Sequence, residues 1–188
     1  LSGIVMAAFL RQHGHVVSVV DGPRTALRYG NCRAETYEDI TRQAIEFRPD
    51  MIAVTILTAD FSECARVARL LRDQFPQAMI VGGGPHPSGE PQATLEQIPE
   101  LDGIGQGPGE DICLDLANGG LPRDTAGCAY MDGGQVRFAD RRRVSVDIDY
   151  LPFPAWDLVD GRFYCELNSA TTFNFLTRSL GLLSSRGC

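Results

Sequence analysis

The sequence predicts an α/β fold: a doubly wound parallel sheet, its first strand apparently missing, followed by a small β-hairpin and an extended linker. Two observations carry this prediction. Segments with helical spacing of apolar residues alternate strictly with short apolar segments up to residue 120, which is typical of parallel strands joined by helices. Glycine-rich loops follow three of the apolar segments, as expected where a strand turns into a helix.

The first half of this alternation contains two helices and two strands. Residues 1–14 carry apolar residues at helical spacing and end in a glycine, a good helix stop. Residues 15–21 (HVVSVVD) predict a short buried strand closed by an Asp-Gly-Pro turn. A helix is expected from Thr36, its N-cap, with Pro49 just past its end. Residues 50–57 form a nearly continuous apolar run, which suits a parallel strand covered on both faces.

The second half repeats the pattern twice. Residues 60–75 place their apolar side chains on one stripe of a helix, and 77–84 follow as a strand. A short helix is expected over 90–99, and a short strand at about 102–105 is followed by a glycine loop. Residues 110–120 predict a helix that two glycines terminate.

The character of the sequence changes after residue 120. Residues 127–138 have the pattern of a hairpin, with Asp132-Gly133 at the turn, and the segment 147–158 is rich in proline and aromatic residues. We therefore divide the chain into an α/β domain (1–122), a hairpin with a Pro-rich linker (123–165) and a C-terminal segment (166–188).

The predicted alternation begins with a helix, which leaves the first strand of the sheet unaccounted for. In a doubly wound sheet of the flavodoxin-like or Rossmann-like type with strand order 2-1-3-4-5, the first strand is central. A chain that started at Leu1 would lack this strand, and the unpaired backbone of its two neighbours would cost several kcal/mol. We hypothesise that the sequence is a fragment, cut after the first strand and at Cys188. A complete central strand built from residues 1–188 would contradict this hypothesis.

Composition excludes several classes of function. The net charge is −7, with 17 Lys and Arg against 24 Asp and Glu, which argues against a nucleic-acid or anionic-membrane surface. No apolar stretch approaches the roughly 20 residues that a membrane span needs. The 6 cysteines lie far apart, without Cys-x-x-Cys spacing, so an internal zinc site is not expected. We expect a reducing, cytoplasmic location instead.

Three loops after predicted strands are the candidate binding site, because ligands of such sheets lie beyond the carboxyl ends of the strands. Gly82 to Gly84 and the glycines of 105–109 lack Cβ atoms, so a flat or phosphate-bearing group could contact bare backbone there. Thr55 and Thr58 offer hydroxyl groups at the end of the strand before them, and His86 is the histidine of these loops.

Each of these residues also has an ordinary structural explanation. The glycines could serve tight turns alone, His86 could be an exposed loop residue, and Thr55 a β-branched strand residue. Glu110 could be a first-turn acid that complements the helix dipole. No Ser/His/Asp set or pair of carboxylates is visible, and the glycines follow the wrong strands for a nicotinamide site.

The serial order of several motifs resembles a known family. The segments GHVVSVVDG, DMIAVTILT, VGGGPHPSGEP and GIGQGPGED, a hairpin, DIDYLPFPAWDL and SSRGC follow one another. This order resembles the N-terminal half of cobalamin-binding radical SAM proteins, relatives of the anaerobic magnesium-protoporphyrin ester cyclase and of B12-dependent methyltransferases. The resemblance implies that residues 1–122 bind cobalamin and that 166–188 begin a truncated radical SAM domain.

In this family the corrin lies across the carboxyl ends of the strands and its nucleotide tail runs into the sheet. The resemblance assigns to cobalamin Thr55, Leu57, Thr58, Gly82, Gly83, Gly84, His86, Gly107, Gly109 and Glu110. The family more often has Gly-Glu-Gly-Glu where this chain has Gly-Pro-Gly-Glu at 107–110. His86 lies in the loop near the tail, so we do not assign it as a cobalt ligand.

Cys188 matches the first cysteine of the family's Cys-x3-Cys-x2-Cys loop, which holds a [4Fe–4S] cluster that binds S-adenosylmethionine. A single thiolate cannot hold such a cluster. The resemblance therefore implies an enzyme of the radical SAM methyltransferase or cyclase class for the intact protein, with cluster and S-adenosylmethionine only there, and no activity for this chain without its radical SAM domain.

Two alternatives remain. The chain could be a non-catalytic cobalamin carrier or sensor module that acts through a partner. It could also be a vestigial domain that keeps the sheet and no longer binds B12. The expected partners are a corrinoid and the absent C-terminal domain, with no nucleic acid and no membrane span.

Overall fold

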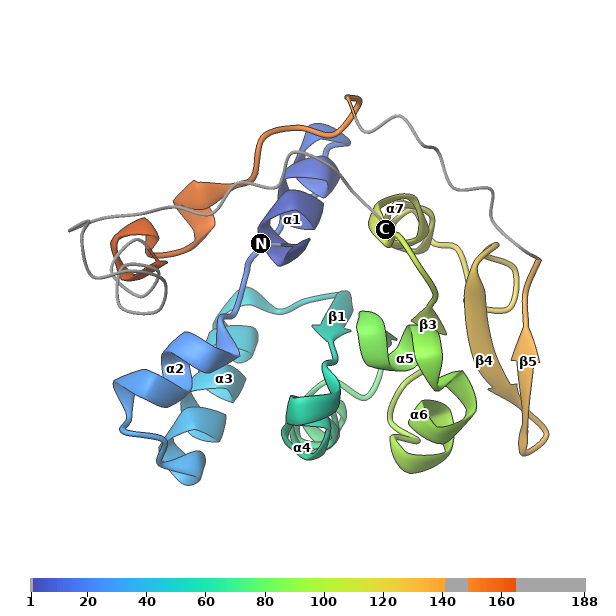
Figure 1. Cartoon of the computed structure of the whole chain (residues 1–188), viewed down its shortest axis with the longest axis horizontal. Helices are drawn as coiled ribbons and strands as arrows, with labels where there is room; N and C mark the ends of the chain where they lie inside the picture. Colours follow the sequence, from blue (N-terminus) through green and yellow to red (C-terminus); the bar gives the residue numbers. More distant parts are fainter. Residues whose placement is uncertain (1, 141–148, 165–188) are drawn as a thin grey trace.

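The computed structural model describes residues 2–140 and 149–164 as a mixed five-stranded sheet with helices on both sides (Figure 1). The strands are β1 (Met51–Thr55), β2 (Met79–Gly83), β3 (Gly103–Gly105), β4 (Cys128–Asp132) and β5 (Gln135–Phe138). The sheet order is β1-β2-β3-β4-β5. β1, β2 and β3 are parallel, whereas β4 pairs antiparallel with β3, and β5 with β4. This confirms the α/β fold class.

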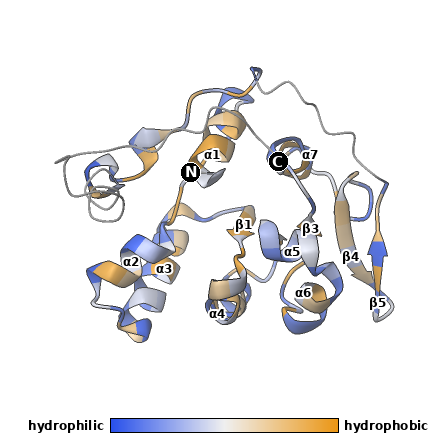
Figure 2. Cartoon of the chain, in the orientation of Figure 1, coloured by the Kyte–Doolittle hydropathy of each residue, from blue (hydrophilic) through white to orange (hydrophobic). Residues whose placement is uncertain are grey.

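The helices divide between the two faces of the sheet. They are α1 (Ser2–Gln12), α2 (Gly22–Arg28), α3 (Arg33–Phe47), α4 (Phe61–Gln74), α5 (Pro85–Gly89), α6 (Pro91–Gln97) and α7 (Glu110–Ala117), with 3-10 turns at Thr58–Asp60 and Trp156–Leu158. α1 and α7 lie on one side of the sheet, and α4 and α6 on the other (Figure 1). Figure 2 shows hydrophobic residues along α1 and hydrophilic ones over α5.

The core has two parts because successive residues of a strand point to opposite faces. Ile80 packs with buried residues of α4 and α6, including Leu71 and Leu95. Its neighbour Val81 packs on the other face with Ile112 and Leu116 of α7. The two faces of β2 are therefore both buried, as expected for a central parallel strand.

The strand predicted over residues 15–21 is wrong. Residues 15–20 have neither helix nor strand structure, and Asp21 is the N-cap of α2. A strand requires a hydrogen-bonded neighbour, and within residues 2–140 and 149–164 the sheet ends at β1. The described residues thus contain no central strand on that side of β1.

Two helix starts differ from the prediction. The Asp-Gly-Pro sequence that was expected to close a strand begins α2 instead, because Asp21 Oδ1 accepts a hydrogen bond from Arg24 N–H at 3.1 Å and a proline lies in the first turn. The N-cap of α3 is Cys32 rather than Thr36. Thr36 is buried inside the helix, and its Oγ1 donates to the carbonyl oxygen of Cys32 at 2.8 Å.

The hairpin is confirmed, with its turn one residue later than predicted. Asp132 pairs with Gln135, so the two-residue turn is Gly133-Gly134, both at positive φ, as a type I′ turn requires. Because β4 also pairs with β3, the hairpin extends the main sheet. The division of the chain at residue 122 stays a prediction, and the segment 166–188 lies outside the described residues.

Residues 149–164 lie along α1 and α2 (Figure 1). Ala155 N–H donates to the carbonyl oxygen of Ile4 at 2.9 Å, and Arg11 pairs with Asp157 at 2.7 Å. We call this segment the connector. Among the helices of the described chain, none combines the length and apolarity needed to cross a bilayer.

Candidate functional site

The carboxyl ends of β1 and β2 lie side by side and bring two of the predicted loops together. Thr55 and Gly83 are register partners, and Ile56 N–H donates to the carbonyl oxygen of Gly83 at 2.8 Å. One residue later, Gly84 adopts φ +107, a conformation that favours glycine, and its backbone approaches that of Ile56. The chain after β2 is thereby held against the chain after β1.

The glycines of these loops fall into two groups. A Cβ added to Gly83 would meet no atom within 4 Å, and the same holds for Gly107 at φ +78. A Cβ on Gly82 would lie 3.0 Å from Leu101 Cδ1, so Gly82 is required by core packing. A Cβ on Gly84 would lie 3.0 Å from the carbonyl oxygen of Ile56. Gly83 and Gly107 therefore offer bare backbone, whereas Gly82 and Gly84 serve the chain's own packing.

His86 is held by the loop after β1. Thr58 Oγ1 lies 3.1 Å from His86 Nδ1, and the rings of His86 and Phe61 have centroids 4.6 Å apart. The hydrogen bond engages Nδ1, and the ring contact fixes the plane of the imidazole. The His86 side chain is therefore held at the same edge as Thr55 and Gly83 and does not extend freely into solvent.

The third loop reaches the same edge through α5. Gly107 N–H donates to Ser88 Oγ at 3.1 Å. Glu110 is the first residue of α7 and is 2% exposed. Gly109 comes near α1, because a Cβ there would lie 2.8 Å from Met6 Cε. The loops after β1, β2 and β3 thus gather at one edge of the sheet.

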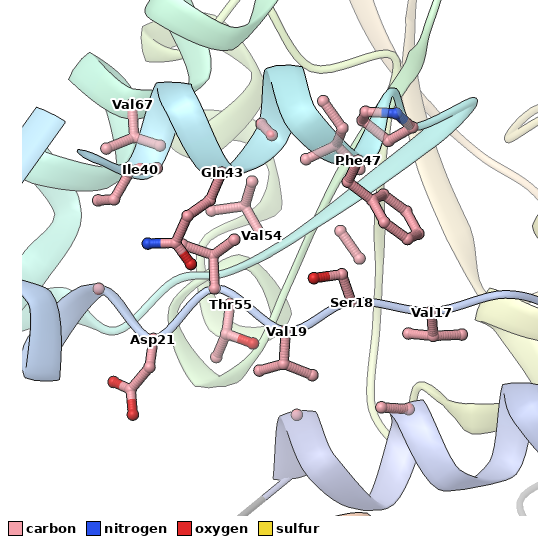
Figure 3. Close-up of a pocket in the computed structure, with 18 of the residues that line it drawn as sticks. Val17, Ser18, Val19, Asp21, Ile40, Gln43, Phe47, Val54, Thr55 and Val67 are labelled. Carbon is pink, nitrogen blue, oxygen red and sulfur yellow. The ribbon is translucent and has the colours of Figure 1, made fainter. Parts of the chain in front are cut away.

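Thr55 and Leu57 face open space. Both are exposed, and both line a cavity of about 1600 Å³ between α1, α3 and β1 (Figure 3). The other predicted site residues lie outside the lining of this cavity. Thr55 offers a hydroxyl and Leu57 an apolar side chain to this space.

The thiols near the site are poor nucleophiles. Burial, together with Asp60 and Glu63, raises the pKa of Cys64 to about 11, and burial chiefly raises the pKa of Cys113 to about 12. The part of the chain that the structure describes contains no group of three His, Cys, Asp or Glu residues able to hold a metal ion. Cys188 lies outside that part.

Two contacts at this edge escaped sequence analysis. Phe61 was placed on the apolar stripe of its helix, and nothing in the sequence indicates that its ring contacts His86. Ser88 lies in the loop PHPSGEP, but its bond to Gly107 depends on α5, a five-residue helix that no strong pattern predicts.

A family model and several curated proteins match this chain in sequence. The family model of the B12 binding domain matches residues 4–117, more than half of the chain. An uncharacterized methyltransferase of Pyrococcus horikoshii is 26% identical over 84% of this chain and 33% of its own. The anaerobic magnesium-protoporphyrin IX monomethyl ester cyclase of Cereibacter sphaeroides is 24% identical over 69% of this chain and 22% of its own. The cytidylyl-2-hydroxyethylphosphonate methyltransferase of Streptomyces wedmorensis is 25% identical over 97% of this chain and 41% of its own.

Solved structures share the fold. The cobalamin-dependent S-adenosylmethionine radical enzyme OxsB, with aqua-cobalamin and S-adenosylmethionine bound, matches 84% of this chain and 22% of its own at a TM-score of 0.66 and 20% identity. The radical S-adenosylmethionine methyltransferase TsrM from Kitasatospora setae, with cobalamin and a [4Fe-4S] cluster bound, matches 88% of this chain and 30% of its own length. The TM-score is 0.60 and the sequence identity 18%. The chain spans less than half the length of each of these relatives. Because the family model of the B12 binding domain matches residues 4–117, the chain belongs to the B12-binding domain family.

Proposed function

We propose that this domain binds cobalamin at the carboxyl edge of β1, β2 and β3. One observation carries the proposal: Gly83 and Gly107 expose bare backbone at the same edge where Thr55 and Leu57 are open to a ligand. A corrinoid has a broad ring and a long nucleotide arm, and both need surfaces from which side chains do not protrude.

The predicted site residues would contribute to the cofactor site in different ways. Gly83 and Gly107 supply open backbone, and Thr55 and Leu57 supply one polar and one apolar contact. Thr58 holds His86 in place. Gly82 and Gly84 shape the loop through internal packing, while Gly109 and Glu110 support the loop before α7. When bound, cobalamin would supply methyl-group transfer or electron transfer, whereas the protein orients it.

We further propose that the intact protein is a radical SAM enzyme of the methyltransferase or cyclase class. Support comes from the names of its relatives and from Cys188, the first position of the cluster motif. In this proposal the [4Fe–4S] cluster and S-adenosylmethionine belong to a further domain. A non-catalytic carrier or sensor module is the second candidate. Two more cysteines at Cys-x3-Cys-x2-Cys spacing in the reading frame past Cys188 would favour the enzyme, and a stop codon would favour the module.

A titration with hydroxocobalamin tests the binding itself. We expect a saturable change in the visible spectrum of the corrinoid at one equivalent, because the site is a single edge of one sheet. A folded chain that leaves the spectrum unchanged and does not retain the corrinoid on gel filtration would make this a vestigial domain and contradict the proposal.

A further inference from the structure

The short helix α5 connects all three loops of the candidate site. His86, its second residue, contacts the loop after β1 through Thr58 and the helix that follows through Phe61. Ser88, two residues later, accepts a hydrogen bond at 3.1 Å from the N–H of Gly107 in the loop after β3. Because α5 itself follows β2, one short helix ties together the loops after β1, β2 and β3 (Figure 1).

The imidazole of His86 has a fixed place between these loops. The backbone N–H of His86 donates to the carbonyl oxygen of Ile56 at 3.4 Å. The ring of Phe61 packs against the imidazole, and Thr58 Oγ1 lies 3.1 Å from Nδ1. Nδ1 is thus engaged within the protein, whereas Nε2 makes no hydrogen bond with the residues that the structure describes. The half-buried side chain therefore has one nitrogen left for a ligand.

The partner of Nδ1 decides what Nε2 can bind. A threonine hydroxyl can donate or accept a hydrogen bond, and a neutral imidazole carries one proton. When Thr58 donates to Nδ1, the ring proton lies on Nε2, and the imidazole presents an N–H donor there. When Thr58 accepts from Nδ1, Nε2 presents a lone pair. The donor suits an oxygen atom of an anionic group, whereas the lone pair suits a metal ion.

The charges of the three loops favour an anionic group at His86. Residues 55–61, 84–90 and 106–111 contain no Lys or Arg, and their Asp and Glu residues are the charged side chains at neutral pH. His86 is the one side chain of these segments that can carry a positive charge. A ligand that brings a negative charge to these loops therefore depends on His86 for a side chain that can balance it.

We propose that His86 Nε2–H donates a hydrogen bond to the phosphodiester of the corrinoid's nucleotide arm, and that Thr58 is the positioning residue that keeps the proton on Nε2. The phosphodiester is the negatively charged group of that arm and lies between the corrin ring and the terminal base. This inference rests on the proposed function and names the part of the cofactor that His86 recognises. It makes His86 a specificity residue, which favours corrinoids with a nucleotide arm over corrinoids without one.

Cobinamide tests this recognition, because it is a corrinoid that lacks the phosphodiester and the base. The parent chain and His86→Ala are titrated with hydroxocobalamin and with diaquocobinamide, and the visible spectrum reports binding. We expect His86→Ala to bind hydroxocobalamin at least about tenfold more weakly and cobinamide within about twofold of the parent chain, because a hydrogen bond to a charged group is lost with the first ligand alone. His13→Gln, at an exposed histidine just past the end of α1, is the control and should change neither affinity.

Further substitutions test the position of the proton. His86→Gln supplies an amide N–H in place of Nε2–H and should recover most of the affinity for hydroxocobalamin. Thr58→Val should weaken hydroxocobalamin binding about three- to fivefold without affecting cobinamide, and Thr58→Ser should restore it. Phosphorus NMR gives a readout that a purely structural role would not move: the phosphodiester signal of bound hydroxocobalamin should differ between the parent chain and His86→Ala.

Inorganic phosphate separates the nucleotide arm from free phosphate as the source of the anionic group. We expect it to leave the His86 ring signals of the corrinoid-free chain unchanged at a concentration at which hydroxocobalamin shifts them, because the bound corrin holds the arm at a high effective concentration. Equal shifts from both would assign His86 to free phosphate and contradict the proposal.

Other outcomes would also overturn it. An equal loss of affinity for both corrinoids in His86→Ala would mean that His86 supports the loops and does not read the arm. Nitrogen coupling in the electron paramagnetic resonance spectrum of bound, reduced cobinamide, absent from His86→Ala, would place Nε2 on cobalt. Should His86→Ala fail to fold by circular dichroism, the selective loss in Thr58→Val and its recovery in Thr58→Ser are required. A folded parent chain that binds neither corrinoid contradicts the proposed function as well, whereas binding of both without these differences removes this inference alone.

Discussion

At the scale of single residues, neighbouring glycines perform different tasks. Gly83 faces open space, whereas Gly82 is enclosed by Leu101, Ile104 and Ile56. Both appear in the sequence as one Gly-Gly-Gly run, and only the surrounding structure separates Gly83, which we assign to the ligand, from Gly82, which the core needs. Substitutions at the two positions should therefore affect different properties.

We expect Gly83→Val to weaken cobalamin binding at least about tenfold, which corresponds to about 1.4 kcal/mol. The valine side chain would extend into the space that we assign to the cofactor, and a β-branched residue suits β2. Hydroxocobalamin titration measures the affinity and urea unfolding checks the fold. Gly161→Val, at an equally open glycine in the connector, is the control. Equal affinities for Gly83→Val and the parent chain would remove Gly83 from the site.

Gly82→Ala should instead destabilise the fold by about 1–3 kcal/mol. Its Cβ would lie 3.0 Å from Leu101 Cδ1 and 3.2 Å from Ile104 Cγ2, both in the core beneath β2. The free energy of unfolding in urea measures the effect. An unchanged free energy would mean that the core adjusts around one methyl group without strain.

At the scale of elements, α2 depends on a single acid. Asp21 caps α2 through Arg24 N–H and also accepts a hydrogen bond from the Tyr164 hydroxyl. We expect Asp21→Ala to lower the free energy of unfolding by about 0.5–2 kcal/mol, and Asp21→Asn to lose less because asparagine is an equally good cap. Urea unfolding of both variants at neutral pH tests this. Equal losses would indicate that charge, rather than capping, is the main contribution.

The same contact gives the connector a pH dependence. Burial, the hydrogen bond to Asp21 and the charge of Asp21 raise the pKa of Tyr164 above its ordinary value of 10.0. The folded chain therefore holds the Tyr164 hydroxyl proton more tightly than the unfolded chain does. The contribution of this hydroxyl to the free energy of unfolding is present below about pH 10 and is lost as the pH rises through the higher folded-state pKa. We expect Tyr164→Phe to lose less stability than the parent chain between about pH 8 and pH 11. Identical losses would exclude Tyr164, and a residual loss in the variant is expected from Cys64 and Cys113, whose pKa values are also raised.

The elements also mark what the sequence could predict. β1, β2 and β3 could be predicted because each is a short apolar run bounded by a helix end and a glycine or threonine loop. The segment 15–21 has the same pattern, yet it is not a strand in the structure, because pairing depends on a neighbour and not on the segment itself. The short helix α5 was missed because its composition, with two prolines and a glycine in five residues, is that of a loop.

The candidate site could also be predicted only in part from the sequence. The meeting of Thr55, Gly83 and Gly107 at one edge could be predicted from parallel strands alone, because their carboxyl ends share an edge. The separation of Gly83 from Gly82, and the contact of Phe61 with His86, depend on side-chain packing that spacing does not encode.

At the scale of the whole molecule, the connector packs against the helices at the other end of the sequence. Besides the Ala155–Ile4 hydrogen bond, it is held by two ion pairs, Arg11–Asp157 and Arg24–Asp160, each at 2.7 Å. Both pairs are largely exposed, and such pairs contribute about 0–1 kcal/mol each. Together with the Ala155–Ile4 hydrogen bond and the Tyr164–Asp21 hydrogen bond, they attach the connector to α1 and to the start of α2, and we expect it to open without unfolding the sheet.

We expect the double variant Arg11→Ala, Arg24→Ala to release the connector while leaving the sheet intact. The amide of Ala155, bonded to Ile4, should exchange several-fold faster, whereas amides of β2 should keep their rates, because both strand faces remain buried. Hydrogen exchange read by NMR measures both, and raising the salt concentration should accelerate Ala155 in the parent chain in the same way. Arg123→Ala, which removes an exposed pair with Asp124 away from the connector, is the control. Unchanged exchange at Ala155 in the double variant would mean that packing against α1, rather than charge, holds the connector in place.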